Sequence, residues 1–303
     1  MLAKECLEEF LLDCDLRRLS HRTIKSYKNN IFRALDYINI HFQVIELEKI
    51  NHQHIRRYMQ HLKQKGLSAI YANGILKGLR SYFNYAIQEG YLVRSPADKV
   101  RWQKEPVKII ETFTNDEVRR MLNVYKRTDF LSIRNKLILA IAFDTGARNS
   151  EICEIKTSDI GSNVILIHGK GSKERNVPLT PYVRKVMLQY ERVKSLYFSD
   201  YFLTYDNYLL SRTGKPLTKE ALEYVFKKAG KAASVRQSIR CSPHTARHYY
   251  AQANLRNGLD VYSLSRLLGH TNINITKRYL QALQDSDIVE MSISTSPLYH
   301  LRP

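Results

Sequence analysis

The sequence has little cysteine and no long apolar run. Its four cysteines lie far apart, at positions 6, 14, 153 and 241, and no two of them form a CxxC pair. This spacing argues against a zinc ribbon and against a disulfide framework. No apolar run approaches the roughly 20 residues that cross a bilayer, and the first residues, MLAKE, lack the apolar block of a signal peptide. We therefore expect a cytoplasmic protein that does not enter a membrane.

Motifs for metal and nucleotide binding are also missing. His244 and His248 have the spacing of two metal ligands on a helix, but no acidic or cysteine ligand accompanies them and no HExxH is present. The glycine-rich segment GKGSK at 169–173 lacks the GxxxxGK[ST] spacing and the following helix of a Walker A loop. We expect no metal and no cofactor.

Positive charge is what the sequence has in excess. Among 303 residues, 48 are Lys or Arg and 29 are Asp or Glu, which gives a formal net charge of +19. The excess is spread over both halves of the chain, and this favours a polyanionic partner such as nucleic acid. A merely basic protein remains the alternative when charge is considered alone.

The first hundred residues have the periodicity of helices. Apolar residues recur at three- and four-residue spacings over 2–14 and after Ser20, Asn51 and Ser68, with Gly90 ending the last helix. Residues 1–100 are thus predicted to form a bundle of four or five helices. The outer faces of two of these helices carry candidate DNA-binding residues, although such residues are often only solvated surface: Arg22, Lys25, Lys28, Asn73, Lys77 and Arg80.

A second domain is predicted after a linker at 101–112, which has charge, a proline and no periodicity. TNDE at 114–117 is a capping box that starts a helix, and helical patterns continue to about residue 158. Two β-branched runs around the GKGSK turn predict a hairpin of residues 164–168 and 175–179. Further helices are expected at about 181 onward, 219–232, 244–257, 260–268 and 272–283, so that residues 113–283 form the second domain and 284–303 a tail.

Several short constellations in this second domain could carry chemistry. Glu151 lies one helical turn from Arg148 and could hold its guanidinium for a phosphate. His244 and Arg247 share one helix face, so that a histidine able to transfer protons would lie beside an arginine able to bind an anion. His270 follows Gly269, and Tyr279 follows two basic residues. Each of these features alone could be purely structural, such as a surface ion pair or a tyrosine packed in the core.

Taken in order, these pieces resemble the tyrosine recombinase, or phage-type integrase, family over nearly the whole chain. The matching segments are TGARNSEI, GKGSKERNVPL, HTARH, LLGH and the late Tyr279. The resemblance is to Xer-like or transposon-encoded simple recombinases. Two departures, Ala246 for a larger apolar residue and the charged pair before Tyr279, concern packing and remove no reacting group.

The resemblance implies a mainly α fold, with an N-terminal helical core-binding (SAM-like) bundle and a C-terminal mixed α/β catalytic domain that form a C-shaped clamp on DNA. The catalytic domain would be mostly helical with a small β-sheet. By this resemblance Tyr279 would be the nucleophile and His244 its base, while Arg148 and Arg247 would bind the phosphate and Glu151 would orient Arg148. His270 would donate a hydrogen bond to the phosphate, and Lys170 would be the general acid, with Lys173 as the fallback. Lys173 and Arg175 would also contact DNA.

The implied reaction passes through a covalent 3′-phosphotyrosine and a Holliday junction, without metal or ATP. Its partners would be double-stranded DNA core sites and three further copies in a homotetramer, with an accessory or partner recombinase as a further candidate. The tail at 284–303 would dock on a neighbouring copy, and docking on its own domain stays open as the alternative. The protein would be associated with the nucleoid. Two alternatives stay open at this point, a type IB topoisomerase and a DNA-binding protein that does not cut, and the target sequence is not determined.

Overall fold

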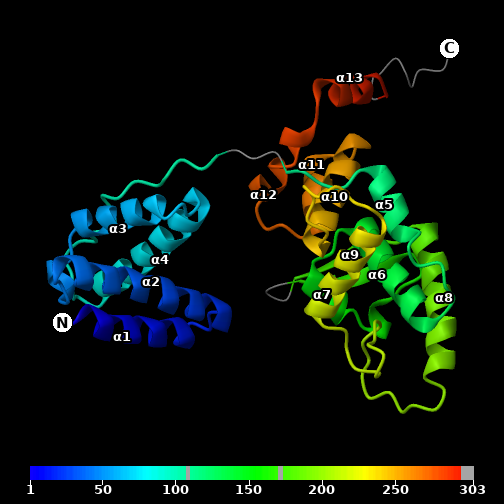
Figure 1. Cartoon of the computed structure of the whole chain (residues 1–303), viewed down its shortest axis with the longest axis horizontal. Helices are drawn as coiled ribbons and strands as arrows, with labels where there is room; N and C mark the ends of the chain where they lie inside the picture. Colours follow the sequence, from blue (N-terminus) through cyan, green and yellow to red (C-terminus); the bar gives the residue numbers. More distant parts are fainter. Residues whose placement is uncertain (107–109, 170–172, 295–303) are drawn as a thin grey trace. The chain divides into compact units, whose positions relative to one another are not determined.

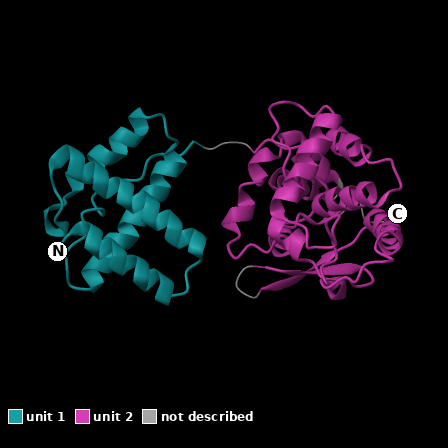
Figure 2. Ribbon diagram, turned by 60° about the horizontal axis from the view of Figure 1, so that its bottom comes forward, with its two compact units in different colours: residues 1–108 teal, residues 109–303 magenta. Residues whose placement is uncertain are grey.

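The computed structural model describes residues 1–106, 110–169 and 173–294, and the chain divides into two compact units, residues 1–108 and 109–303 (Figure 2). Part of the predicted linker, residues 107–109, lies outside the described residues, as do Lys170 and the end of the predicted tail from 295 onward. The linker and tail boundaries therefore stay predictions, and each unit is described by itself.

Unit 1 is helical, as the sequence predicted (Figure 1). The side chains of Ser20, Asn51 and Ser68 each accept a hydrogen bond from a backbone N–H in the first turn of the next helix, which explains why these helices begin there. The elements in its described part are α1 (Ala3–Leu16), α2 (His21–Phe42), a short 3-10 turn (Leu47–Lys49), α3 (His52–Gln64) and α4 (Ala69–Gln88).

Unit 2 is also mainly helical and contains the predicted hairpin (Figure 1). Its described elements are α5 (Asn115–Leu122), α6 (Phe130–Thr145), α7 (Asn149–Glu154), a 3-10 turn (Thr157–Asp159), β1 (Val164–His168), β2 (Glu174–Pro178), α8 (Pro181–Tyr197), α9 (Lys219–Ala232), α10 (Pro243–Arg256), α11 (Val261–Leu268), α12 (Asn274–Lys277), a 3-10 turn (Leu280–Ala282) and α13 (Asp285–Ser294). None of the described helices is both long and apolar enough to cross a membrane.

Helix α6 forms the centre of unit 2. It contacts α5, α7, α8, α9 and α10, and its successive residues 138–141 are at most 2% exposed. A helix that is apolar all round can only be stable when other elements cover every face. The C-terminus of α6 is thereby fixed in the interior, and Arg148 follows it closely as the N-cap of α7.

The hairpin pairs β1 and β2 in an antiparallel register, with Val164 opposite Pro178 and His168 opposite Glu174. Ile165, Ile167 and Val177 are at most 1% exposed, so one face of the hairpin packs on the core of unit 2. The alternation of buried and exposed residues along the strands sets this register.

The prediction of one continuous helix over 272–283 is wrong. The chain forms the single turn α12 and then a 3-10 turn, with Tyr279 at the N-cap of the 3-10 turn. Thr276 and Tyr279 are 0% and 3% exposed, and the Asn272 side chain accepts a hydrogen bond from the Asn274 N–H. This local side chain-to-backbone bond competes with helical hydrogen bonding in the polar segment, and Thr276 and Tyr279, three residues apart, are both buried.

Gly146 is expected to tolerate no side chain. It ends α6 with φ +60°, and a Cβ there would overlap the ring of Tyr250 and come within 3.1 Å of Leu268 Cδ2. Gly146→Ala should therefore lower the free energy of unfolding by roughly 2–5 kcal/mol, through backbone strain and overpacking together. Denaturant unfolding of the purified variant measures this change.

Gly258→Ala is the matched control for Gly146→Ala. Gly258 has φ +90°, but nothing lies within 4 Å of the Cβ position. Only the backbone strain, about 1 kcal/mol, is expected there. Equal losses at the two glycines would show that the space next to Tyr250 does not matter.

Candidate active site

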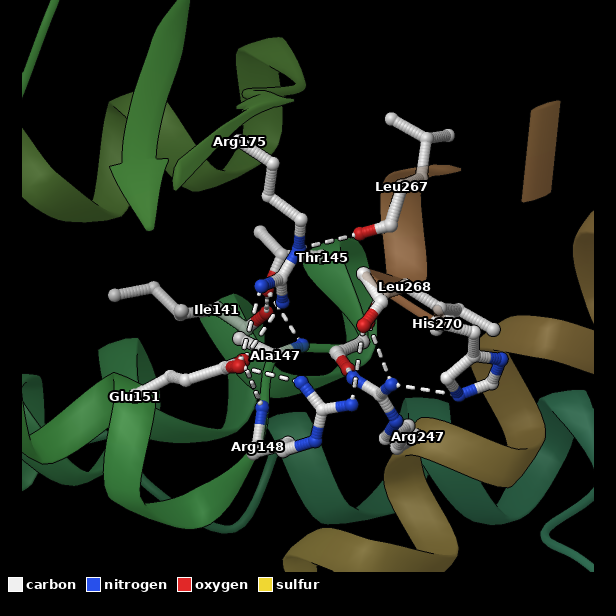
Figure 3. A network of polar contacts seen from close by, with 12 residues as sticks. Ile141, Thr145, Ala147, Arg148, Glu151, Arg175, Arg247, Leu267, Leu268 and His270 are labelled. Carbon is white, nitrogen blue, oxygen red and sulfur yellow. Dashed lines mark hydrogen bonds and ion pairs between the residues drawn. The ribbon is translucent and has the colours of Figure 1, made fainter. Parts of the chain in front are cut away.

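Two arginines share one buried carboxylate where α7 meets the hairpin (Figure 3). Glu151, on α7, accepts hydrogen bonds from the Arg148 backbone N–H and Arg148 Nη1 at 2.8 and 2.7 Å. It also accepts from Arg175 Nη1 and Nη2, at 3.1 and 2.7 Å. Burial alone would raise the pKa of Glu151, but the bonds and charges of the two arginines outweigh it and lower the pKa to about 2. Glu151 is therefore ionised and holds both guanidinium groups.

The C-terminus of α11 holds three arginines through three successive carbonyl groups. Arg175 Nε donates to the Leu267 oxygen at 2.7 Å, Arg247 Nη2 to the Leu268 oxygen at 2.7 Å, and Arg148 Nη2 to the Gly269 oxygen at 3.4 Å. The end of a helix has unpaired carbonyls and partial negative charge, both of which suit cations. This helix end gathers arginines from α7, β2 and α10 around one point (Figure 3).

Arg247 is almost wholly enclosed, whereas Arg148 is open. The Arg247 residue is 4% exposed and also donates to the Gly146 oxygen at 2.7 Å. Burial, and then the charge of Arg148, lower its pKa to about 10. The Arg148 side chain is 40% exposed. An anion arriving at this place would meet Arg148 first and would relieve the repulsion between the two guanidinium groups.

His270 is tied to Arg247 by hydrogen bonding. Arg247 Nη2 lies 2.9 Å from His270 Nε2, and His270 Nδ1 lies 2.8 Å from Thr276 Oγ1. Because a guanidinium only donates, Nε2 is the acceptor and Nδ1 carries the proton. The sequence predicted His270 as a donor to phosphate, but in this arrangement its Nε2 is occupied as an acceptor from Arg247.

The hydroxyl of Tyr279 is in contact with a histidine that the sequence did not single out for this role. Tyr279 Oη lies 2.9 Å from His248 Nδ1, while the rings of His244 and His248 meet edge to face with centroids 4.2 Å apart. Burial raises the pKa of Tyr279, so its neutral phenol donates to His248. The hydrogen-bond partner of the Tyr279 hydroxyl is thus His248, and His244, the base that the resemblance implied, lies against the ring of His248.

The two histidines beside the arginines make unit 2 sensitive to mild acid. Burial and nearby cations lower the pKa values of His248 and His270 from 6.5 to about 4. Between these values the unfolded chain binds protons that the folded chain does not, so stability falls as the pH falls through this window. The melting temperature of unit 2 should drop by several degrees between about pH 6.5 and pH 4.5.

His168→Gln is the control for this acid effect. His168 donates to Asp159, and the bond raises its pKa, so its contribution has the opposite sign and is present at low pH. The acid-side loss should persist in His168→Gln and become smaller in His248→Asn, as thermal melts over a pH series would show. If the melting temperature of His248→Asn fell as much in acid as that of the wild type, the assignment of the acid effect to His248 would be contradicted.

The remaining predicted residues are dispersed. Lys170, the predicted general acid, lies outside the described residues, and Lys173, directly before β2, is exposed. Arg22, Lys25 and Lys77 are exposed on unit 1, and Lys28 is exposed within 3.9 Å of Glu8. These positions leave their role in binding DNA a prediction.

Two predicted DNA contacts are instead engaged by the segment that follows α4. Asn73 is 7% exposed; its amide nitrogen donates to the Gln103 oxygen at 2.9 Å and to Glu105 Oε1 at 2.8 Å. Arg80 donates to the Val100 oxygen at 2.8 Å and lies 4.4 Å from the centre of the Trp102 ring. Because segment 100–105 covers them, Asn73 is a buried structural residue in this state, and Arg80 is partly covered.

Comparison with known protein families follows the same division of the chain. The model of the Phage integrase family matches residues 111–285, and that of the Phage integrase N-terminal SAM-like domain matches residues 7–90. The chain is similar to Tyrosine recombinase XerC of Listeria innocua, with 29% identity over 89% of this chain and 90% of the relative. It is 30% identical to Tyrosine recombinase XerD of Oceanobacillus iheyensis, over 87% and 88% of the two chains.

Solved structures with little sequence identity share the fold. The XerH site-specific recombinase bound to palindromic difH substrate has a TM-score of 0.74 at 20% identity, over 92% of this chain and 81% of that one. A lambda integrase dimer bound to a COC′ core site has a TM-score of 0.72 at 20% identity, over 91% of this chain and 97% of that one. These matches confirm the predicted mainly α fold, with a SAM-like N-terminal domain and a mostly helical catalytic domain that contains a small β-sheet, and the C-shaped clamp stays a prediction. The chain belongs to the phage integrase family and is a tyrosine-type site-specific recombinase.

Proposed function

We propose that unit 2 cuts and rejoins DNA strands with Tyr279 as the nucleophile. The Tyr279 oxygen forms a bond to the scissile phosphorus, the bond from phosphorus to the 5′ oxygen breaks, and a 3′-phosphotyrosine and a free 5′ hydroxyl result. The observation that carries this proposal is the cluster of Arg148, Arg247 and Arg175 with a single carboxylate, Glu151, close to the tyrosine.

The charge of this cluster suits a phosphodiester in its transition state. Three guanidinium groups face one carboxylate, so the described side chains of the cluster leave positive charge uncompensated. A pentacovalent phosphorus gathers additional negative charge on its non-bridging oxygens, which fixed cations stabilise more than the ground state. Arg148, as the open member, and Arg247, as the buried one, are the proposed ligands.

Proton transfer completes the step. The phenol proton of Tyr279 passes toward the histidine pair, with His248 as the first acceptor by contact and His244 behind it. Lys170, with Lys173 as fallback, would give a proton to the leaving 5′ oxygen. Because Tyr279 is 3% exposed, a DNA phosphate reaches its oxygen only after the segment around α12 shifts.

Recombination adds strand exchange between two DNA sites. A 5′ hydroxyl of the partner duplex reverses the step on the other strand, and two rounds pass through a Holliday junction; no metal or ATP is used because the ester keeps the bond energy. We propose that four copies act together on DNA in the cytoplasm. The exposed apolar residues Ile288, Val289 and Ile293 of α13, which are 51–59% exposed, support a contact to a neighbouring copy. Lambda integrase has been solved as a tetramer on a Holliday junction.

The topoisomerase alternative is not favoured, since relatives that match this chain over most of their length are named as recombinases. The test uses nicked duplexes from the DNA around the protein's own gene, with EDTA present. A wild-type adduct on the 3′ end, together with joined products from two different duplexes, supports the proposal. Adducts on the 5′ end, or relaxation of supercoils without any strand exchange, would contradict it.

A further inference from the structure

Arg175 does not have the free guanidinium that a DNA contact needs. The sequence placed it among the DNA-binding residues, but its side chain is 11% exposed. All three of its nitrogens have partners, with Nε on the Leu267 oxygen and both Nη atoms on Glu151. With every nitrogen already bonded within the protein, Arg175 has little capacity to bind a phosphate (Figure 3).

The planar guanidinium group of Arg175 is closely surrounded by the backbone at two glycines. A Cβ at Gly269, which has φ +65°, would lie 3.0 Å from Arg175 Nη1, and one at Gly169 would lie 3.7 Å from the same atom. Two glycines therefore border the guanidinium. The pair of bonds to Glu151 uses the planar, bidentate geometry that lysine cannot reproduce.

Glu151 links Arg175 to Arg148. Arg148 Nη1 and Arg175 Nη1 both donate to Glu151 Oε1, at 2.7 and 3.1 Å. With Arg175 in place, Arg148 has only part of the carboxylate. Without Arg175, the full charge of Glu151 would attract Arg148, whose side chain could then take both oxygens and turn away from the open side of the site.

We propose that Arg175 is a positioning residue of the strand-cleavage reaction: by neutralising and orienting Glu151 and tying β2 to the end of α11, it keeps the guanidinium of Arg148 available to the scissile phosphate. This inference rests on the proposed function. It assigns Arg175 an effect on the cleavage step, exerted through Arg148, and no direct share in DNA affinity.

The test compares single-turnover cleavage of a nicked duplex with duplex affinity. Arg175→Gln should slow cleavage at saturating DNA about 10- to 100-fold, by analogy with residues that orient the ligands of a metal through hydrogen bonds, with Kd nearly unchanged. Arg175→Lys should cleave almost as slowly as Arg175→Gln, because lysine lacks the guanidinium group that bonds both oxygens of Glu151. Arg266→Gln, an exposed arginine on α11, is the matched control and should leave both values unchanged.

The effect must also depend on Arg148. In an Arg148→Lys background, adding Arg175→Gln should cause a further loss well below its loss in the wild type, since residues that act as a unit are not additive. Equal losses in both backgrounds, or a weaker Kd with unchanged cleavage at saturation, would overturn the proposal.

A second measurement is independent of any activity. The ¹⁵Nε–H resonance of Arg148, assigned by its absence in Arg148→Lys, should shift in Arg175→Gln and in Arg175→Lys, and stay in place in Arg266→Gln. An unmoved resonance in a folded Arg175 variant would overturn the inference. Failure of the wild type to form an adduct would contradict the proposed function, whereas an unmoved Arg148 resonance or equal losses in both backgrounds would contradict the inference alone, so the two failures are distinguishable.

Discussion

Tyr279→Phe is expected to abolish the covalent adduct and all strand exchange while DNA binding is retained. The change removes the proposed nucleophile oxygen and one hydrogen bond, to His248 Nδ1. Losing a nucleophile reduces the rate by at least about 10⁴-fold, whereas leaving one buried nitrogen unpaired costs about 1–3 kcal/mol of stability. Denaturing electrophoresis after incubation with a nicked duplex measures the adduct, and fluorescence anisotropy measures the binding.

Tyr250→Phe is the matched control, because Tyr250 packs in the same apolar cluster as Tyr279 and is also buried. It should form adducts at a rate close to that of the wild type. Adduct formation by Tyr279→Phe would assign the nucleophile to another residue. Loss of adduct in both variants would point to a packing effect of the cluster.

Arg247→Lys is expected to have the second largest effect on cleavage. Arg247 donates to the Gly146 and Leu268 oxygens and to His270, so its loss removes a proposed phosphate ligand and releases the elements that it joins. A lysine keeps one charge but only one donor centre. The cleavage rate at saturating DNA should fall about 10²- to 10³-fold, the range for losing one preorganised charge-stabilising donor.

Thermal melts must accompany this measurement, because Arg247 is buried. A variant that is folded at the assay temperature and still cleaves within about threefold of the wild type would contradict the role of Arg247, since a preorganised donor contributes far more than that. Arg240→Lys, at an exposed arginine ahead of the same helix, should leave cleavage and melting unchanged.

Local chemistry explains how much of the fold could be predicted. The helices predicted to follow Ser20, Asn51 and Ser68 begin there in the structure, with these residues as N-caps, because capping depends on residues within one turn of each other. The capping box from Thr114 to Glu117 is formed for the same reason. The order along the chain of a few residues in short motifs was sufficient to indicate the family: Arg148, Lys170, His244, Arg247, Gly269, His270 and Tyr279.

What the sequence could not predict depends on contacts between distant segments. Arg175 and Leu267 are 92 positions apart, and Tyr279 and His248 are 31 apart. Nothing local to Arg175 distinguishes a buried fork from a DNA contact, and His248 differed from His244 only in its place on the helix. Asn73 is buried because segment 100–105 folds back on α4, which no periodicity within α4 reveals.

The most direct test of the account is to identify the linked residue by mass spectrometry. The wild-type adduct, formed in EDTA on a nicked duplex, is digested with nuclease and protease, and the nucleotide-bearing peptide is sequenced. The account predicts a nucleotide attached through its 3′ phosphate to Tyr279, in a peptide containing the sequence YLQALQDSDIVEM. A nucleotide on any other residue, or one attached through a 5′ phosphate, would contradict the account.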